Sequence, residues 1–404
     1  MSFGFQFDES EMDEEYLSSS QPQQPFSAAS TSAHALSTEQ APFASHSVGD
    51  MLQNLPSRIS YSSISVNLAG GERTQRLLRR DLFDARFQML LDEDDNDEEQ
   101  EQEQEQEESG SKDAQANGRV TAQGSVDAES DLIPGVYEGG LKTWECALDL
   151  VETLDALHAT SGGAEADGSW SSRLNGKNVL ELGCGTALPT LFLLSQVLQD
   201  PIGEKLNLTL HLADYNAAVL SLVTLPNLLL TWYASPASSA YRTTLEAEHL
   251  RQERHELTRR GQDHFDTSTQ AEPGDQGELA ISDELLSSFS ASLQERGIGL
   301  KFYSGAWINF PKTSAKMDMT LTSETIYSLE SLPALVELLS RYAKPEAQAE
   351  AGLVLVAAKV IYFGVGGGVE SFKQTLEQLT PAAKLEPLHS VVKGVGRTVL
   401  SVTF

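Results

Sequence analysis

The segment at residues 178–189, NVLELGCGTALP, constrains the fold more than any other part of the chain. An apolar run ends in an acidic residue, two glycines follow, and a second apolar run has helical spacing. In a parallel sheet, this order places backbone N–H groups at the carboxyl end of a strand and at a helix N-terminus, where ligands bind. We therefore expect a small, charged, carboxylate-bearing ligand at residues 183–185.

Strand-like and helix-like segments alternate around this motif. A second strand, beginning at Leu206, ends at Asp214, and a helical apolar run with a break at Pro226 follows it. Further strands are predicted at 178–182, 300–304, 317–322 and 353–362, helices at 187–198, 332–342 and 369–379, and a hairpin at 387–392 and 398–404. This order predicts an α/β, Rossmann-like fold with a seven-stranded doubly wound sheet and an antiparallel final strand.

The N-terminal third has a different composition. Residues 1–130 contain 26 of the 59 acidic residues but only 8 of the 28 basic ones, and 12 of the acidic residues lie in the run at 92–108. Such a segment buries too little apolar surface to offset the entropy of ordering, so we predict a largely disordered acidic tail. Near 74–91, however, leucine and phenylalanine recur at helical spacing, which predicts an amphipathic helix.

The folded domain is predicted to span residues 131–404, because the composition changes at DLIPGVYEGGLKTWE. Residues 235–297 depart from the strand–helix alternation, and we interpret them as an insertion. His249, His255 and His264 lie in this insertion. Their spacing lacks cysteine or aspartate partners, so no metal site is predicted.

Composition also limits the partners. A net charge of −31 repels nucleic-acid phosphates, so no direct nucleic-acid binding is expected and a basic protein partner is favoured. The two cysteines, Cys146 and Cys184, do not make a disulfide scaffold, which indicates a reducing compartment. The chain has no apolar run of about 20 residues, so no membrane association is expected. We expect a monomer.

Two cofactors suit a glycine pair followed by an acidic strand end: nicotinamide dinucleotide and S-adenosylmethionine. A dinucleotide fingerprint needs a third glycine or alanine for close helix packing and an acidic residue about 20 positions later. Here Leu188 occupies the third position, and Asp214 follows Gly183 by about 30 residues. The spacing therefore favours S-adenosylmethionine, with the Asp214 carboxylate accepting two ribose hydroxyls; a turn-forming aspartate is the alternative.

Two tryptophans could contact the methyl donor, and one strand end could contact the acceptor. Trp307 follows a strand and can stack on an adenine ring, although a core tryptophan is the alternative. Trp144 precedes the first helix, where the face of its ring could lie over the sulfonium and attract its positive charge. The segment TSETIY, at 322–327, ends the strand beside the glycines. Glu324 and Tyr327 are therefore predicted to face the substrate, and a structural role for both at the strand end is the alternative.

The run GVGGG, at 364–368, has more backbone freedom than a strand or a helix needs. A plain connector between a strand and a helix would need fewer glycines. We predict that this run folds over the substrate as a flexible loop.

The segments PGVYEGGLKTWE, VLELGCGT, ADYN, SGAW, TSETIY and AAKVIYFGVGGG together resemble the histidine protein methyltransferase family, which belongs to the seven-strand class I methyltransferases. The resemblance covers residues 132 to about 368, without the insertion, and implies S-adenosylmethionine as the cofactor. The cofactor-binding residues that it implies are Thr143, Trp144, Glu145, Cys146, Ala147, Gly183, Gly185, Asp214, Tyr215, Asn216, Gly305, Ala306, Trp307 and Ser323. The family often has an acidic residue where Ala306 stands.

The resemblance also implies a function. Fungal and animal members methylate a histidine of large-subunit ribosomal protein L-three, which implies a ribosomal protein partner and residence in the cytoplasm and nucleus. Related lysine methyltransferases often have D-x-x-Y where this chain has Glu324 and Tyr327, so lysine methylation is an alternative. A non-catalytic, chaperone-like binder of a basic ribosomal protein is another. On the histidine reading, Glu324 or Tyr327 holds the ring N–H opposite the reacting nitrogen.

Overall fold

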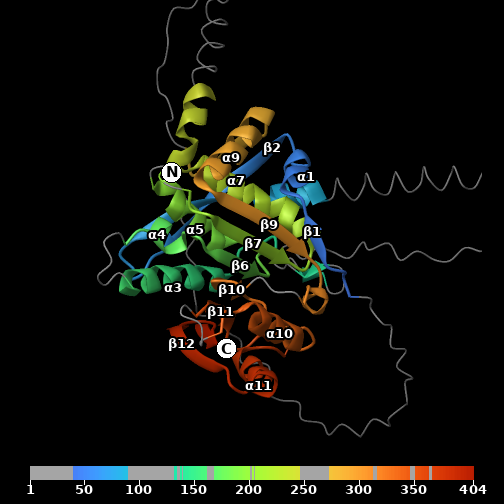
Figure 1. Cartoon of the computed structure of the whole chain (residues 1–404). Helices are drawn as coiled ribbons and strands as arrows, with labels where there is room; N and C mark the ends of the chain where they lie inside the picture. Colours follow the sequence, from blue (N-terminus) through green and yellow to red (C-terminus); the bar gives the residue numbers. More distant parts are fainter. Residues whose placement is uncertain are drawn as a thin grey trace, which may run out of the picture. The chain divides into compact units, whose positions relative to one another are not determined.

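The computed structural model describes residues 40–89, 132–133, 137–138, 140–161, 168–200, 203, 205–245, 273–312, 316–345, 351–363 and 366–404. Residues Gln40–Phe404 form one compact unit (Figure 1). The acidic run at 92–108 and the three histidines of the predicted insertion lie outside the described residues, so those predictions remain expectations.

The central sheet has eight strands in the order β1-β9-β7-β6-β10-β11-β13-β12. Their bounds are β1 Ala44–His46, β6 Asn178–Leu182, β7 Leu208–Asp214, β9 Ile298–Ser304, β10 Met319–Ser323, β11 Leu353–Lys359, β12 Lys384–Val391 and β13 Arg397–Thr403. Strands β9, β7, β6, β10 and β11 run parallel. Strand β13 is antiparallel to both neighbours, which confirms the predicted Rossmann-like fold with an antiparallel final strand. Strand β1, antiparallel to β9, is an eighth strand that the sequence did not predict.

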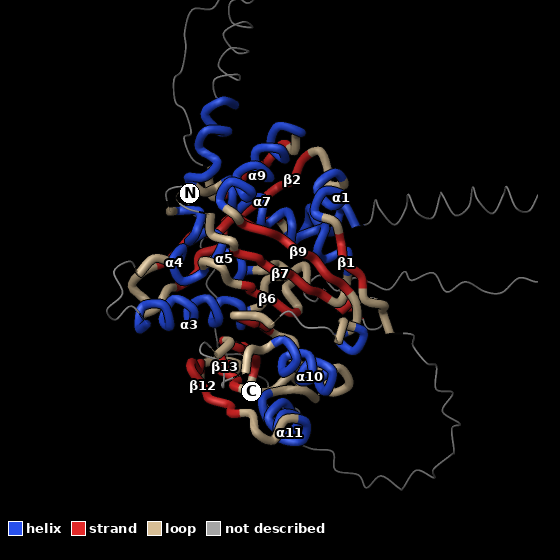
Figure 2. The backbone as a smooth tube through the Cα atoms, viewed as in Figure 1, coloured by secondary structure: helices blue, strands red, loops and turns tan. Residues whose placement is uncertain are grey.

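Helices cover both faces of this sheet (Figure 2). One face packs against α3 (Glu145–Ser161), α5 (Leu188–Gln199) and α7 (Leu225–Tyr233), and the other against α10 (Leu332–Tyr342) and α11 (Val369–Leu379). Alternate residues of β6 serve the two cores: Val179 packs with the first group, whereas Leu180 and Leu182 pack with the second. A strand covered on both faces needs a continuous apolar run, which explains why 178–182 stood out in the sequence.

A second, antiparallel sheet has the strand order β3-β2-β8, with bounds Thr74–Arg80, Arg58–Asn67 and Gln276–Ala280. The helix predicted at 74–91 is therefore wrong for 74–80, and only 82–89 is helical within the described residues. Leu77 and Leu78 are buried in the core shared with α5 and α7. Pairing with the strand-forming sequence of β2 overrides the helical spacing, which is a weak prior beside tertiary contacts.

The predicted domain boundaries also differ from the structure. The folded unit begins at Gln40 rather than at residue 131, because β1, α1 (Val48–Gln53), β2 and β3 all belong to it. The end of the predicted insertion is an integral part of the fold: β8 pairs with β2, and α9 (Asp283–Arg296) buries Leu285, Phe289 and Leu293. Residues 246–272 lie outside the described residues.

The helices were also compared with what a membrane span requires. Among the described residues, no single helix is both long and apolar enough to cross a membrane. One pair of helices, Ala217–Tyr233 and Pro236–Leu245, is together long and apolar enough to cross a membrane, but it is bent by 77°.

Candidate active site

Four neighbouring parallel strands bring most of the predicted site residues to one edge of the sheet. The strands β9, β7, β6 and β10 are adjacent and point the same way. Gly183 follows β6, Asp214 ends β7, Gly305 follows β9 and Ser323 ends β10. The carboxyl ends of parallel strands form the usual ligand crevice of such sheets, so these residues meet at one candidate site.

The Asp214 carboxylate is buried and fixed by backbone donors. Its Oδ2 accepts a hydrogen bond from the Gly185 N–H at 2.9 Å, and its Oδ1 accepts one from the Asn216 N–H at 3.3 Å. Asn216 in turn caps the short helix α6 (Ala217–Val219) by accepting from the Ala218 N–H at 2.9 Å. Each carboxylate oxygen has two acceptor positions, so Asp214 retains capacity for ligand hydroxyls. Tyr215, between them in sequence, is 36% exposed.

Both motif glycines have left-handed backbones, with φ of 62° at Gly183 and 50° at Gly185. A Cβ atom at Gly183 would lie 2.4 Å from Cγ2 of Thr325, so this glycine makes room for a neighbouring side chain. A Cβ atom at Gly185 would lie 3.1 Å from the Gly140 carbonyl oxygen. The Gly185 carbonyl accepts from the Thr224 hydroxyl at 2.6 Å. The loop therefore needs glycine for packing as well as for any approach of a ligand.

The loop after β9 is joined to Asp214 and to the N-terminal segment. The Gly305 N–H contacts the carbonyl oxygens of Asp214 at 3.2 Å and Tyr215 at 3.1 Å. The Ala306 N–H donates to the Ala41 carbonyl at 3.0 Å. Trp307 is 8% exposed, and its Cζ2 lies 3.9 Å from the Cβ position of Gly183. Trp307 is therefore a core residue that lies beside the glycine loop, and its stacking on an adenine ring remains a prediction.

The start of α3 contributes polar and aromatic groups. The Thr143 and Thr186 hydroxyls lie 3.0 Å apart, which connects this segment with the glycine loop. The ammonium of Lys359, at the end of β11, lies 4.8 Å from the centre of the Trp144 ring and 3.4 Å from the Glu145 carboxylate. Burial raises the pKa of Glu145, but its helix N-terminal N–H and Lys359 outweigh that effect and the net pKa is lowered.

The next two residues of α3 are buried. Cys146 is fully buried and Ala147 is 7% exposed. Burial, together with the nearby Glu324 carboxylate, raises the pKa of the Cys146 thiol. This thiol therefore stays protonated and has the properties of a packing residue rather than a nucleophile.

Glu324 combines a constrained backbone with a buried charge. Its φ is 57°, which is uncommon for a residue other than glycine, and its N–H donates to the Ala357 carbonyl at 2.9 Å. Its side chain is 8% exposed, and the Lys359 ammonium lies 3.8 Å from Oε1. The Cys146 thiol and the Tyr362 hydroxyl lie beside it, yet neither carboxylate oxygen has a well-formed hydrogen bond to the described residues.

Tyr362 lies beside this carboxylate, and Tyr327 packs against Tyr362. Their rings meet edge to face with centroids 6.3 Å apart. The Tyr362 hydroxyl accepts from the Lys359 N–H at 3.2 Å, and burial followed by the nearby Glu324 charge raises the pKa of this hydroxyl. Lys359 and Tyr362 were absent from the predicted site. The sequence could have identified them by their position at the end of a predicted parallel strand, because the same position identified Asp214.

The three glycines at 366–368 are packed rather than free. Ser328 bridges to Gly366 and Ile361 to Gly368. A Cβ atom at Gly367 would lie 2.1 Å from the Tyr327 carbonyl oxygen, and one at Gly368 would lie 2.5 Å from the Val360 carbonyl oxygen. Close approach to two strand-end loops therefore explains these glycines, in place of the flexibility expected from the sequence. Residues 364–365 lie outside the described residues.

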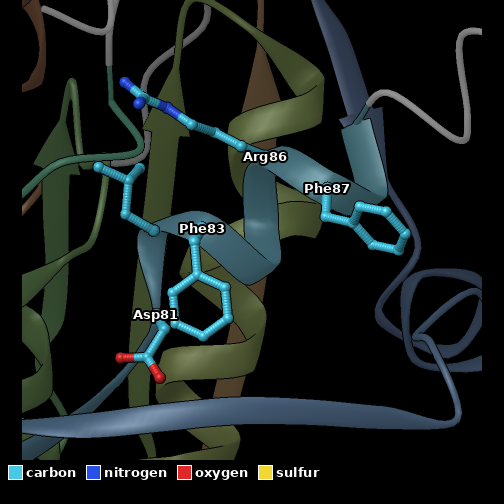
Figure 3. Close-up of a pocket in the computed structure, with 5 residues that line it drawn as sticks. Asp81, Phe83, Arg86 and Phe87 are labelled. Atoms are coloured by element: carbon cyan, nitrogen blue, oxygen red, sulfur yellow. The ribbon is translucent and has the colours of Figure 1, made fainter. Parts of the chain in front are cut away.

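A separate hollow lies beside the helix at 82–89. Asp81, Leu82, Phe83, Arg86 and Phe87 line it, and the rings of Phe83 and Phe87 point away from the helix (Figure 3). None of the predicted cofactor or catalytic residues lines this hollow. It is therefore distinct from the site at the edge of the sheet.

The residues at the sheet edge fit S-adenosylmethionine by their chemistry. Asp214 offers a buried carboxylate beside the glycine loop, with acceptor capacity for hydroxyls. Trp307 and Trp144 supply aromatic surface beside the glycine loop and beside Glu145. Carboxylate and aromatic groups suit a ligand with a diol, an ammonium group, a sulfonium charge and a purine ring.

Known proteins similar to this chain were found by sequence. No protein-family model matches the chain. Histidine protein methyltransferase 1 of Saccharomyces cerevisiae is 30% identical over 341 residues, 81% of this chain and 76% of that protein. The protein of the same name in Schizosaccharomyces pombe is 29% identical over 364 residues, which cover 88% of this chain and 84% of that protein. A homologue from Bos taurus is 30% identical over 69% of this chain and 59% of its own length.

Solved structures give a weaker likeness. A ribosomal protein L11 methylase from Lactobacillus delbrueckii subsp. bulgaricus aligns with a TM-score of 0.28 and 10% identity, over 66% of this chain and 82% of that one. The rRNA methyltransferase aviRa from Streptomyces viridochromogenes aligns with a TM-score of 0.31 and 13% identity, over 65% and 88%. These scores are too low to support an argument about function. The sequence relatives are close enough, and the chain belongs to the histidine protein methyltransferase family.

Proposed function

We propose that this chain transfers a methyl group from S-adenosylmethionine to a ring nitrogen of a histidine in a large-subunit ribosomal protein. Family membership gives the coarser statement, an S-adenosylmethionine-dependent protein-histidine methyltransferase. The ribosomal target, with residence in cytoplasm and nucleus, is the finer part of the proposal. It is supported by the motif likeness and by a net charge of −31, which favours a basic partner.

The donor side of the site has residues for the ribose and the base of the cofactor. S-adenosylmethionine supplies an electrophilic methyl group on its sulfonium when bound. Asp214 accepts the ribose hydroxyls, since its oxygens are fixed by the Gly185 and Asn216 N–H groups. Trp307, buried against the glycine loop, offers the stacking surface for the base.

One observation carries the acceptor side: the buried Glu324 carboxylate lacks a well-formed hydrogen bond among the described residues. The Cys146 thiol, the Tyr362 hydroxyl and the Lys359 ammonium at 3.8 Å surround this carboxylate without a well-formed hydrogen bond, so its oxygens can accept an N–H from a ligand. The backbone of Glu324 is in the left-handed region, a strained conformation that often occurs at functional sites.

A histidine acceptor needs little more than orientation. The imidazole pKa of about 6.5 leaves the ring mostly neutral at pH 7, with a lone pair on one nitrogen and a proton on the other. Glu324 can accept that N–H, which fixes the tautomer and holds the second nitrogen towards the methyl group. The same carboxylate would stabilise the positive charge on the ring as the N–C bond forms and the methyl–sulfur bond breaks, which leaves a neutral thioether. It could then accept the ring N–H proton or pass it to water, so that neutral methylhistidine is released.

The product distinguishes the competing functions. The full chain is incubated with labelled S-adenosylmethionine and large-subunit ribosomal proteins from cells that lack the enzyme, and the labelled protein is hydrolysed. Methylhistidine is the expected product, and methyllysine would instead support the lysine alternative. Binding of a ribosomal protein with no incorporated label would support the non-catalytic binder.

A further inference from the structure

Six large apolar side chains are exposed on loops at the carboxyl edge of the central sheet. They are Leu329, Val360, Ile361, Phe363, Val392 and Val395, and we call them the apolar patch. Phe363 is 84% exposed and Val392 is 92% exposed, which is more than any other large apolar side chain among the described residues. Apolar side chains scattered singly need no explanation, but a contiguous group marks an interaction surface.

Printed contacts join the three loops of the patch. The Val360 N–H donates to the Gly396 carbonyl at 2.8 Å, and Val360 Cγ2 lies 3.3 Å from the Cβ position of Gly396. This connects the loop after β11 with the turn between β12 and β13. Leu329 Cδ1 lies 3.4 Å from the Cβ position of Gly366, next to the bridge from Ser328. The backbone segments that carry the patch are therefore tied together at the same edge of the sheet.

The patch is continuous with the candidate active site. Val360 directly follows Lys359, whose ammonium lies 3.8 Å from the Glu324 carboxylate. Leu329 follows Tyr327 by two residues, and Tyr362, within the patch loop, packs edge to face on Tyr327. A polypeptide that presents a side chain to Glu324 would place its neighbouring residues within reach of these loops, because successive residues of an extended chain are only about 3.3–3.6 Å apart.

We propose that the apolar patch binds the substrate segment that carries the target histidine, through bulky apolar side chains within a few residues of that histidine. This inference rests on the proposed function. The occupant is a protein segment because the patch offers apolar area on loops next to the site that the proposed function assigns to a protein histidine. The apolar patch thus selects substrates by the residues around the histidine.

The test uses the full chain and synthetic peptides of about 15 residues that are basic and have a central histidine. One set has leucine or valine beside the histidine, and the other has serine there. The variant F363S/V392S removes the most exposed side chains of the patch. Phe87→Ser is the matched control, because Phe87 is 62% exposed but lies on the helix at 82–89.

The wild-type chain is expected to bind the apolar-flanked peptides about tenfold more tightly than the serine-flanked ones by fluorescence anisotropy. The F363S/V392S variant loses that preference, whereas its kcat at saturating peptide and its donor affinity stay unchanged. Phe87→Ser retains the preference. No preference in the wild type, or a preference kept by F363S/V392S, overturns the inference. A dimer that F363S/V392S abolishes would assign the patch to a second copy and also overturn it.

The same experiment distinguishes failure of the docking proposal from failure of the proposed function. If the apolar-flanked peptides bind preferentially but no methylhistidine forms on any peptide or ribosomal protein, the docking surface stands and the histidine-transfer proposal fails. If methylhistidine forms equally well on both peptide sets, the function stands and the docking proposal fails.

Discussion

At the residue scale, strand-end positions were predictable and their packing partners were not. Gly183, Asp214 and Glu324 could be identified because each follows or ends an apolar run, and parallel strands place such ends at one edge. The sequence predicted that the segment 322–327 lies beside the glycines, but it could not identify Thr325 as the side chain that occupies the space above Gly183, because that depends on the backbone conformation after β10. Position 183 therefore requires glycine for two reasons: its backbone is left-handed, and the Thr325 side chain leaves no room for a Cβ atom.

Gly183→Ala is expected to destabilise the chain by about 1–3 kcal/mol and to weaken donor binding, because its Cβ would lie 2.4 Å from Thr325 Cγ2. Thermal unfolding and calorimetric titration with S-adenosylmethionine measure the two effects. Adding Thr325→Ser removes the clashing methyl group and should restore part of the loss. Gly168→Ala is the control, because no atom lies within 4 Å of its Cβ position. Equal effects of the Gly183 and Gly168 changes would contradict this account.

At the element scale, the N-terminal segment supports the cofactor side of the site. β1 pairs with β9, His46 Nε2 lies 2.7 Å from the Ser304 hydroxyl, and the Ala306 N–H donates to Ala41. The sequence of this segment is short, polar and rich in alanine, and it has neither helical nor alternating apolar spacing. Its order therefore depends on the edge of β9, a tertiary contact that no local pattern encodes. The β3 strand was missed for the same reason, since its leucines have helical spacing.

Gly305→Ala tests this support, because a Cβ atom at Gly305 would lie 2.3 Å from the Pro42 carbonyl oxygen. We expect the segment to detach, so that donor affinity falls about tenfold and proteolysis near residue 42 becomes faster. Gly176→Ala is the matched control, since Gly176 also has a positive φ of 72° but no atom within 4 Å. If both variants lose the same donor affinity, backbone strain alone would account for the result.

At the scale of the whole molecule, the sheet divides two cores, and its central strand contains a buried acid. Glu181 is 1% exposed and accepts from the Thr190 N–H at 3.0 Å and from the Thr190 hydroxyl. Burial raises its pKa to about 8, although the Thr190 hydrogen bonds oppose that rise. The folded chain therefore keeps a proton on Glu181 that the unfolded chain releases above its ordinary pKa of 4.5.

The contribution of Glu181 to the free energy of unfolding is complete below pH 4.5 and is lost as the pH rises towards about 8. Glu181→Gln keeps an oxygen for Thr190 but cannot titrate. The difference in unfolding free energy between wild type and variant should change by about 1.4 kcal/mol per pH unit within this window, with the wild type losing stability. Urea unfolding at several pH values measures it. Parallel pH profiles would show that Glu181 does not titrate in this range.

The sequence predicted the C-terminal part of the molecule better than the N-terminal part. The helices at 332–342 and 369–379 agree with α10 and α11, because apolar residues at helical spacing cover one face of a parallel sheet. Residues 40–89 fall in the part that the sequence predicts to be largely disordered with a helix near 74–91, because acidic and serine-rich neighbours dominate the composition of that third. Ile59, Val66 and Leu78 are nevertheless buried in the same core as α5 and α7.

The central claim is that the buried Glu324 carboxylate orients the acceptor histidine, and the kinetics of Glu324 variants on a histidine substrate test it most directly. Glu324→Ala should lower kcat about 100-fold with donor affinity unchanged, and Glu324→Gln, which keeps an acceptor oxygen, should restore part of kcat. Glu330→Ala, an exposed glutamate in the same loop, should have no effect. Unchanged methylhistidine formation by Glu324→Ala, or a loss due entirely to donor binding, would contradict the claim.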